Sequence, residues 1–426
     1  MIRKSVIGAS VALLVISAAI FAGPAIAAPA PKDVLTHYAE LAHAKFDDAL
    51  STAKALDAAI DALIAKPSEE TLKAAREAWI AARVPYQQTE VYRFGNPIVD
   101  DWEGKVNAWP LDEGLIDYVD AAYGTESDGN SLYVANVIAN PKIKINGEEV
   151  DASEITPEFL AETLHEAGEV EANVATGYHA IEFLLWGQDL NGTGPGAGNR
   201  PYTDYDTANC TNGNCDRRAA YLKAASTLLV QDLEEMVVAW ALEGEATKAV
   251  LADEQKGISA ILTGMGSLSY GELAGERMKL GVLLHDPEEE HDCFSDNTHA
   301  SHLNDAIGIA SAYTGEYTRV DGTKMTGPSL SELVAAKDQA LDTEMKGKLD
   351  TTLAAMNTMA ERAKTTEAYD QMIGEGNAEG NATVQAAIDG LVDQTQTIQR
   401  VIASLDLGTI ELEGSDSLDS PEAVFQ

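Results

Sequence analysis

The chain has 426 residues, and its 69 acidic residues against 29 Lys and Arg give a formal net charge of −40. A surface this negative repels nucleic acid and anionic lipid, so the composition argues against a nucleic-acid-binding protein. It also attracts cations, although an acidic surface is as often a means of staying soluble. Hydrophobic residues make up 45% of the chain, which is enough to bury an ordinary core.

Residues 1–27 have the pattern of a secretory signal peptide. Arg3 and Lys4 give it a positive start, residues 6–21 are almost entirely apolar, and residues 25–27 (Ala-Ile-Ala) match a cleavage site. The apolar stretch is short for a membrane span and no lipoprotein Cys follows it, so a retained anchor is the less favoured alternative. We therefore expect an exported, periplasmic protein without a transmembrane segment. Its mature charge would be −42, because the leader holds two basic and no acidic residues.

Helical periodicity dominates the rest of the chain. Apolar residues over 34–64 form the stripe of a long amphipathic helix, and a second helix is expected over 69–94 with a kink at Pro85. Ser329 and Glu332 form a capping box at the start of a later helix. The same spacing predicts further helices over residues 157–187, 216–242, 254–284, 298–313, 329–341, 344–364 and 380–404.

Two segments lack this periodicity. Residues 95–155 are rich in Gly, Asn, Asp and Pro, and we expect them to be irregular apart from a short helical piece near 113–121. Within them, residues 142–150 predict a β-hairpin that turns at an Asn-Gly pair, residues 146–147. Residues 187–215 form a second loop rich in Gly, Pro and Asn.

The three cysteines suit an oxidising compartment. Cys210 and Cys215 flank Thr-Asn-Gly-Asn, a turn-forming tetrapeptide that can bring two sulfurs within bridging distance, so we expect a disulfide. A zinc site is less favoured, because no second Cys pair is present to complete four ligands. Cys293 is left over.

Eight or more helices with almost no strand pattern predict an all-α fold. Its simplest form is two tandem helical-bundle halves with one small β-hairpin insertion. The loop 187–215 is the expected boundary between the halves. We therefore divide the chain into an N-terminal half, 28–200, a C-terminal half, 201–410, and an acidic, flexible tail, 411–426.

The first candidate site is the pattern Gly177-x-His179-x-x-Glu182. His179 and Glu182 are three residues apart on a helix, so both project from one face, where an imidazole and a carboxylate can bind one metal ion. Two ligands do not make a site, and others must come from elsewhere in the chain. The alternative is a simple His–Glu hydrogen bond that faces solvent or a helix interface. Gly177 costs helix stability, which suggests the close approach of another element.

The second candidate site is the segment 288–299, which concentrates carboxylates and histidines. Such side chains suit iron or zinc. The alternative is structural, because Asp296 or Asn297 is also a typical N-cap for a helix that would start near His299. The candidate ligands here are Glu290, His291, Asp296 and His299, with His302 one turn further on.

A third pattern places Arg83, Tyr86, Glu90 and Arg93 along the second helix. We expect these residues to have a supporting role, with Arg83, Glu90 and Arg93 in buried ion pairs between helices. The sequence contains no His-Glu-x-x-His zinc-peptidase motif, no Gly-x-Ser-x-Gly motif and no Walker loop. These absences leave the catalytic residues of any enzyme activity unassigned.

Taken together, the motifs resemble the imelysin family, which includes iron-regulated protein A and insulin-cleaving metalloprotease types and is classed with the M75 peptidases. The resemblance extends over essentially the whole mature chain. It is carried by Gly177, His179 and Glu182 followed by Leu-Leu-Trp186-Gly187, by Arg83-x-Pro85-Tyr86, and by Glu276-Arg-Met278 leading into His291-x-Cys293-Phe-Ser-Asp-Asn-Thr298-His299.

The resemblance implies a bacterial envelope protein with two related helical halves and a Gly-x-His-x-x-Glu site near their interface. Members of the family are linked to iron uptake. On this basis His179 and Glu182 are the expected metal ligands, with iron the expected metal and zinc the alternative. The expected supporting residues around them are Gly177, Arg83, Tyr86, Glu90 and Trp186.

Three functions are compatible with these residues. The leading one is a periplasmic accessory of iron uptake that binds iron, or an iron-bearing ligand, through His179, Glu182 and carboxylates of the other half, and works with an envelope transport partner. The second is a metallopeptidase in which Zn²⁺ on the same pair activates water. The third is a non-catalytic envelope interaction protein whose polar residues only hold helices together.

Overall fold

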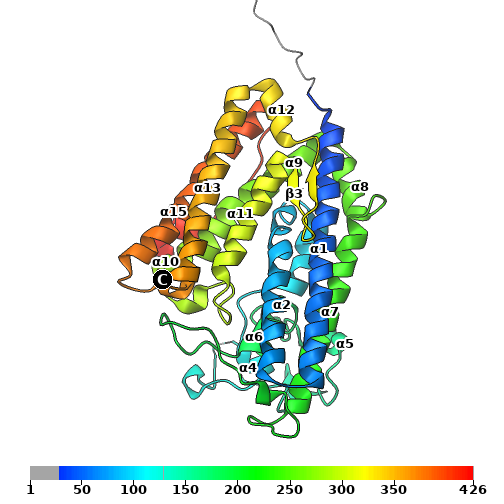
Figure 1. The fold of residues 1–426 in the computed structure, drawn as a ribbon, viewed down its shortest axis with the longest axis vertical. Helices are drawn as coiled ribbons and strands as arrows, with labels where there is room; N and C mark the ends of the chain where they lie inside the picture. Colours follow the sequence, from blue (N-terminus) through cyan, green and yellow to red (C-terminus); the bar gives the residue numbers. More distant parts are fainter. Residues whose placement is uncertain (1–27, 128, 426) are drawn as a thin grey trace, which may run out of the picture.

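The computed structural model describes residues 28–127 and 129–425 (Figure 1). The expected signal peptide lies on residues 1–27, outside the described residues. The chain is mostly helical, which confirms the all-α prediction. Within the described ranges, none of the helices combines the length and apolarity needed to cross a bilayer.

One group of helices is built around α1 (Pro31–Ala65), as predicted for residues 34–64. The apolar stripe of α1 is buried because α2 (Glu69–Gln87) and α7 (Cys215–Ala239) pack against it, and the three helices run side by side in Figure 1. The shorter α6 (Gly177–Trp186) packs against α2 and α7. The second predicted helix is shorter than expected, since α2 ends at Gln87 and the 3₁₀ turn η1 (Glu90–Tyr92) follows.

A second group contains the remaining long helices. Its members are α9 (Glu254–Ser267), which continues through the π-helical segment η5 (Leu268–Lys279) into α10 (Leu280–Leu284), and then α11 (Thr298–Thr314), α13 (Gln339–Thr365) and α15 (Ala378–Ser404). α13 packs against α11 and α15, and α15 packs against η5. The two groups meet where α11 lies on α2 and α9 lies on α1.

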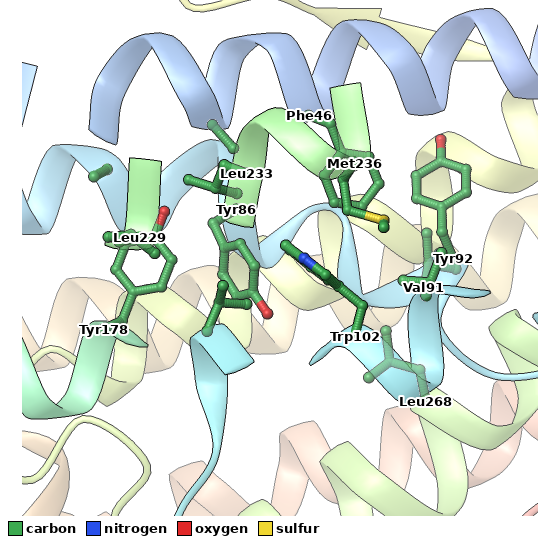
Figure 2. Close-up of a cluster of buried hydrophobic side chains, with 14 of the residues drawn as sticks. Phe46, Tyr86, Val91, Tyr92, Trp102, Tyr178, Leu229, Leu233, Met236 and Leu268 are labelled. Atoms are coloured by element: carbon green, nitrogen blue, oxygen red, sulfur yellow. The ribbon is translucent and has the colours of Figure 1, made fainter. Parts of the chain in front are cut away.

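Aromatic side chains fill much of the core of the first group (Figure 2). Phe46, Tyr86, Tyr92, Trp102 and Tyr178 come from five different elements and are all buried. The rings of Tyr86 and Tyr178 lie 4.8 Å apart, which joins α2 to α6 at the level of the candidate site. Large buried rings of this kind contribute strongly to stability, and they fix α6 relative to its neighbours.

The division expected at 200/201 does not separate the two packing groups. α7 follows that position in the chain, yet it packs against α1 and α6 of the first group. The first group therefore continues beyond residue 201.

The short elements of the fold are α3 (Pro97–Asn107), α4 (Glu113–Ile116), η2 (Ala121–Tyr123), α5 (Pro157–Phe159), η3 (Leu160–Leu164), η4 (Tyr202–Asp204), α8 (Glu245–Leu251), η6 (Pro287–Glu289), α12 (Leu330–Lys337), α14 (Tyr369–Ile373), α16 (Asp416–Asp419) and η7 (Pro421–Phe425).

The predicted β-hairpin is present as β1 (Lys142–Ile145) and β2 (Glu148–Asp151), paired antiparallel. Its turn residues Asn146 and Gly147 have φ values of 53° and 84°, as a two-residue hairpin turn requires. A second hairpin, β3 (Glu316–Thr318) with β4 (Lys324–Thr326), was not predicted, because strands of three residues are too short to show alternation. The predicted hairpin is therefore confirmed, and the structure adds a second one.

Two further expectations need correction. The helix expected over 157–187 is broken between η3 and α6, where Glu166, Gly168 and Glu169 all have positive φ, a conformation that ends a helix. The acidic tail is not free over residues 411–425. Instead, Ser417 is buried and its hydroxyl donates to the Gly275 carbonyl of η5 at 2.9 Å.

Two local predictions are confirmed. Cys210 and Cys215 form a disulfide with a Cα separation of 5.9 Å, at the point where the loop 187–215 enters α7. Ser329 and Glu332 form the predicted capping box, with Glu332 N donating to Ser329 Oγ and Ser329 N donating to Glu332 Oε2. Cys293 is a free cysteine.

Candidate metal centre

The candidate site begins where α6 begins. Gly177 is the first residue of α6 and has φ +78°, and a Cβ atom added to it would lie 2.4 Å from the carbonyl oxygen of Val106. Only glycine fits both the conformation and the contact with α3. The Gly-x-His-x-x-Glu motif therefore opens a helix rather than lying inside one, and His179 and Glu182 sit on its first turns.

His179 and Glu182 contact each other, as the spacing predicted. Nδ1 of His179 lies 3.1 Å from Oε2 of Glu182. The other carboxylate oxygen, Oε1, accepts hydrogen bonds from the backbone N and the hydroxyl of Ser295 at 3.0 and 2.6 Å. Glu182 thus orients the imidazole and links α6 to the segment before α11. Nε2 of His179, on the far side of the ring, is buried and has no hydrogen-bond partner.

His291 and Asp292 lie beside His179 and come from the segment between η6 and α11. His179, His291 and Asp292 each offer one ligand atom, and these atoms all lie within 4.8 Å of one another. The three side chains are 1%, 2% and 0% exposed. The ligand set that the structure brings together is therefore two imidazoles and one carboxylate, with Glu182 behind His179 instead of within the set.

Asp292 is held in place from both sides of the site. Its Oδ1 accepts a 2.7 Å hydrogen bond from Nη2 of Arg83, on α2. Its Oδ2 accepts hydrogen bonds from Asn297 and Ser301. Nη1 of Arg83 also donates to Oδ1 of Asn107 at 2.7 Å. Arg83 therefore forms a buried ion pair, as expected from the sequence, and it joins the first helical group to the segment that carries Asp292.

The electrostatics of the site favour neutral imidazoles. Burial lowers the pKa of His179 to about 3, with the Arg83 cation as the second cause, and burial lowers the pKa of His291 well below its usual value. Burial raises the pKa of Asp292, but the Arg83 cation, the neighbouring His179 and the hydrogen bonds from Ser301 and Asn297 together outweigh it and bring the pKa down to about 2. Neutral imidazole and ionised carboxylate are the forms that bind metal ions.

Glu182 behaves differently from Asp292. Burial raises the pKa of Glu182 well above its usual value, and the nearby Asp292 carboxylate raises it further, whereas the hydrogen bonds from Ser295 lower it. A cation bound beside His179 would favour the ionised form of Glu182.

The other expected supporting residues, Tyr86, Glu90 and Trp186, contact residues outside the His179–His291–Asp292 group. Tyr86 donates to Oε1 of Glu90 at 2.9 Å, and Arg277 of η5 donates to Oε2 of Glu90 at 2.8 Å. This ion pair between the two helical groups matches the role expected for Glu90. Trp186 lies at the other end of α6, where its ring packs on Trp79 with centroids 5.4 Å apart.

A second group of carboxylates lies close by. Glu290, Asp296 and Asp370 each offer a ligand atom within 4.8 Å of the others. Asp370 comes from α14 and was missed, because no local pattern marks it. Burial raises the pKa of Asp296 to about 7 and that of Asp370 to about 6, although backbone amides near Asp370 lower the latter.

The two remaining histidine candidates stand apart from both groups. His299 makes a 3.1 Å contact from Nδ1 to the backbone oxygen of Asp296 and belongs to neither group of ligand atoms. His302 is buried, and its ring packs edge-on against Tyr369 at 5.2 Å between centroids. The metal-ligand expectation for His299 therefore receives no geometric support.

Fold and site together define an all-α protein with a buried His–His–Asp group at the junction of two helical groups. The chain belongs to the imelysin family, whose profile matches residues 42–398. No curated protein shows a significant match to the chain.

Solved structures that share this fold include the following two. One is described as an iron-regulated protein A precursor from Parabacteroides distasonis ATCC 8503. It is 18% identical, with a TM-score of 0.62, over 89% of this chain and 96% of that one. The other is an imelysin-like protein from Psychrobacter arcticum 273-4. It is 17% identical, with a TM-score of 0.54, over 90% of this chain and 100% of that one. At these identities the likeness concerns the fold.

Proposed function

We propose that this imelysin-family protein binds iron at a centre formed by His179, His291 and Asp292. Two observations carry the proposal: the buried Nε2 of His179 has no hydrogen-bond partner, and His179, His291 and Asp292 each offer a ligand atom within 4.8 Å of the others. A buried polar atom without a partner costs free energy, and a bound cation would remove that cost. Two imidazoles and a carboxylate suit Fe²⁺, and they also suit Zn²⁺.

Glu182 acts as the positioning carboxylate of this centre. When ionised, it accepts a hydrogen bond from Nδ1–H of His179, which leaves the lone pair on Nε2 free for the ion. Ser295 holds Glu182 through both its backbone N and its hydroxyl. Arg83 neutralises part of the charge of Asp292 and limits the affinity of the centre, which suits a protein that must release its cargo.

The burial of the centre supports ion binding over peptide hydrolysis. His179, His291 and Asp292 are each at most 2% exposed, so a peptide backbone cannot reach them without a rearrangement. A peptidase also needs a base close to the attacking water. The carboxylate that contacts His179 from outside the ligand set, Glu182, is already engaged by His179 and Ser295. We propose iron instead of zinc as the bound metal because one similar structure is described as an iron-regulated protein A precursor.

The proposed place of work is the periplasm, where an iron-binding protein would deliver its ion to an envelope transport partner. The leader pattern of residues 1–27 supports export, and the Cys210–Cys215 disulfide suits an oxidising compartment. Fractionation of cells, with N-terminal sequencing of the mature protein, tests this part of the proposal. We expect a periplasmic protein that begins at Ala28.

The binding proposal is tested by titrating chelator-treated protein with Fe²⁺ under anaerobic conditions and measuring the heat of binding by calorimetry. A separate assay tests for peptide hydrolysis. We expect one equivalent of Fe²⁺ to bind and no chelator-sensitive hydrolysis. If the protein hydrolyses peptides and chelation abolishes the activity, the metallopeptidase alternative replaces the proposal. If no divalent metal ion binds, the non-catalytic interaction protein remains.

A further inference from the structure

The carboxylates of Glu290, Asp296 and Asp370 lie apart from the ligands of the proposed iron centre. Glu290 follows η6, Asp296 lies just before α11, and Asp370 is on the first turn of α14. Each offers an oxygen within 4.8 Å of the others. Between residues 28 and 425, residue 128 aside, no Lys or Arg forms an ion pair with any of the three.

Several of these oxygens are buried and lack hydrogen bonds of regular geometry. Asp370 and Glu290 are each 1% exposed. Neither carboxylate oxygen of Asp370 makes a hydrogen bond of regular geometry, although the backbone amides of residues 370 and 371 lie near them. Oε1 of Glu290 and Oδ1 of Asp296 have no hydrogen-bond partner either. Two of the carboxylates, Glu290 and Asp370, are buried and Asp296 is half-buried. Without a cation such carboxylates repel one another and lose hydration, so they would be unfavourable unless a ligand compensates them.

The donor set identifies the class of that ligand. All three side chains offer oxygen, and neither imidazole nor thiolate belongs to the group. Hard divalent cations prefer such a set, and oxygens on opposite sides of Ca²⁺ lie about 4.6–5.2 Å apart. The spread of at most 4.8 Å therefore matches the spacing of oxygens around a Ca²⁺ ion.

We propose that Glu290, Asp296 and Asp370 form a second cation site, of the oxygen-only kind that binds Ca²⁺, and that it fastens the segment 285–297 to α14. A neighbouring contact already joins the same two parts, since Nδ1 of His285 lies 2.6 Å from the backbone oxygen of Ile373. Glu290 directly precedes His291 and Asp292, so the ion also holds the segment that presents these two residues. The site uses none of the proposed iron ligands and stands independently of the iron proposal.

The test uses full-length mature protein from which metal ions have been removed with a chelator. Its thermal unfolding is compared with and without CaCl₂, and its Ca²⁺ binding is measured by calorimetry. For wild type we expect one specific Ca²⁺ site and a rise in Tm of about 2 °C or more at saturation. Asp370→Asn removes one charged ligand while keeping the side-chain shape. We expect this variant to lose affinity at least about tenfold and to be no less stable than wild type without Ca²⁺, because the lost charge had no partner.

Three further variants make the result decisive. Asp350→Asn changes an exposed carboxylate on α13 and should keep the full Ca²⁺ response. This variant is the control for weak Ca²⁺ binding to the acidic surface. Glu290→Gln should reproduce the loss seen in Asp370→Asn. His179→Gln should lose iron but keep the Ca²⁺ response, so the two sites can fail separately. The proposal is overturned if Ca²⁺ leaves the wild-type Tm unchanged, or if Asp370→Asn responds as wild type does.

Discussion

Nδ1 of His179 and Oε2 of Glu182 lie 3.1 Å apart, inside a helix whose ten residues are all buried. This contact engages Nδ1 with the carboxylate and leaves the buried Nε2 without a hydrogen-bond partner. It makes Glu182 a residue that acts through His179. The role of Glu182 can therefore be separated from that of a direct ligand.

Glu182→Gln should weaken metal binding without abolishing it. A glutamine keeps the hydrogen-bond geometry but loses the negative charge that favours the metal-bound tautomer of His179. We expect affinity to fall about 10–100-fold, the range seen for partners that orient a metal-bound His. Calorimetric titration with Fe²⁺ measures the change, and Ser295→Ala, which removes only one of the donors to Glu182, should have a smaller effect. A complete loss of binding in Glu182→Gln would make Glu182 a direct ligand instead.

Gly177→Ala should destabilise the fold at the start of α6. The new methyl group would lie 2.4 Å from the Val106 carbonyl, and alanine is strained at φ +78°. We expect a loss of roughly 3 kcal/mol or more in the free energy of unfolding, measured with urea. Gly104→Ala is the matched control, because a methyl group there meets nothing within 4 Å in the same helix as Val106. The control should gain roughly 0.5–1 kcal/mol.

Arg83→Met should leave Asp292 as a buried carboxylate without its cation. Such a change typically costs about 3–5 kcal/mol, and Arg83→Met combined with Asp292→Asn should recover part of the loss. The exposed ion pair of Arg400 with Glu344 provides the control, since Arg400→Met should cost less than about 1 kcal/mol. Equal effects of the two substitutions on urea unfolding would show that the Arg83–Asp292 pair does not hold the two helical groups together.

Lys45 gives the fold a pH dependence that does not involve the metal centre. Burial lowers the pKa of Lys45 to about 7, and its Nζ has no hydrogen-bond partner, although it lies over the rings of Tyr92 and Tyr317. Between this pKa and the usual value for lysine, the unfolded chain holds a proton that the folded chain has lost, so stability rises with pH in that window. Below it, the folded protein must carry a buried ammonium.

Lys45→Met should therefore stabilise the protein at about pH 6 by roughly 2–4 kcal/mol, after allowance for the lost ring contacts. The gain should shrink as the pH rises to about 9, where wild-type Lys45 is neutral in the folded state. Lys54→Met, which changes a half-exposed lysine paired with Glu234, should show no comparable pH dependence. A variant less stable than wild type at the lower pH would contradict this account.

The sequence predicted most of the helices because their apolar stripes are local and regular. α1, α11 and α15 begin and end close to their expected positions. It did not predict the break before α6, where Glu166 and Glu169 adopt positive φ in a stretch that otherwise continues the helical pattern. Nor did it predict the packing of α7 with α1, which depends on how the chain returns after a long irregular region.

The candidate site was predicted only in part, because the sequence shows local spacing but not long-range packing. Spacing along one helix is enough to pair His179 with Glu182. It does not reveal which nitrogen faces the carboxylate, nor that His291 and Asp292 reach His179 from a distant segment. Asp370 shows the limit most clearly, because it joins Glu290 and Asp296 only through tertiary packing.

The central claim is that His179 and His291 bind one metal ion together. It is tested most directly by the metal content of protein purified from the periplasm, compared among wild type, His179→Gln, His291→Gln and His299→Gln. His299 is the matched control, since it lies near the site but outside the group of ligand atoms. The account predicts about one equivalent of iron in wild type and His299→Gln and a loss of at least about tenfold in the other two variants. The same metal content in all four proteins would contradict it.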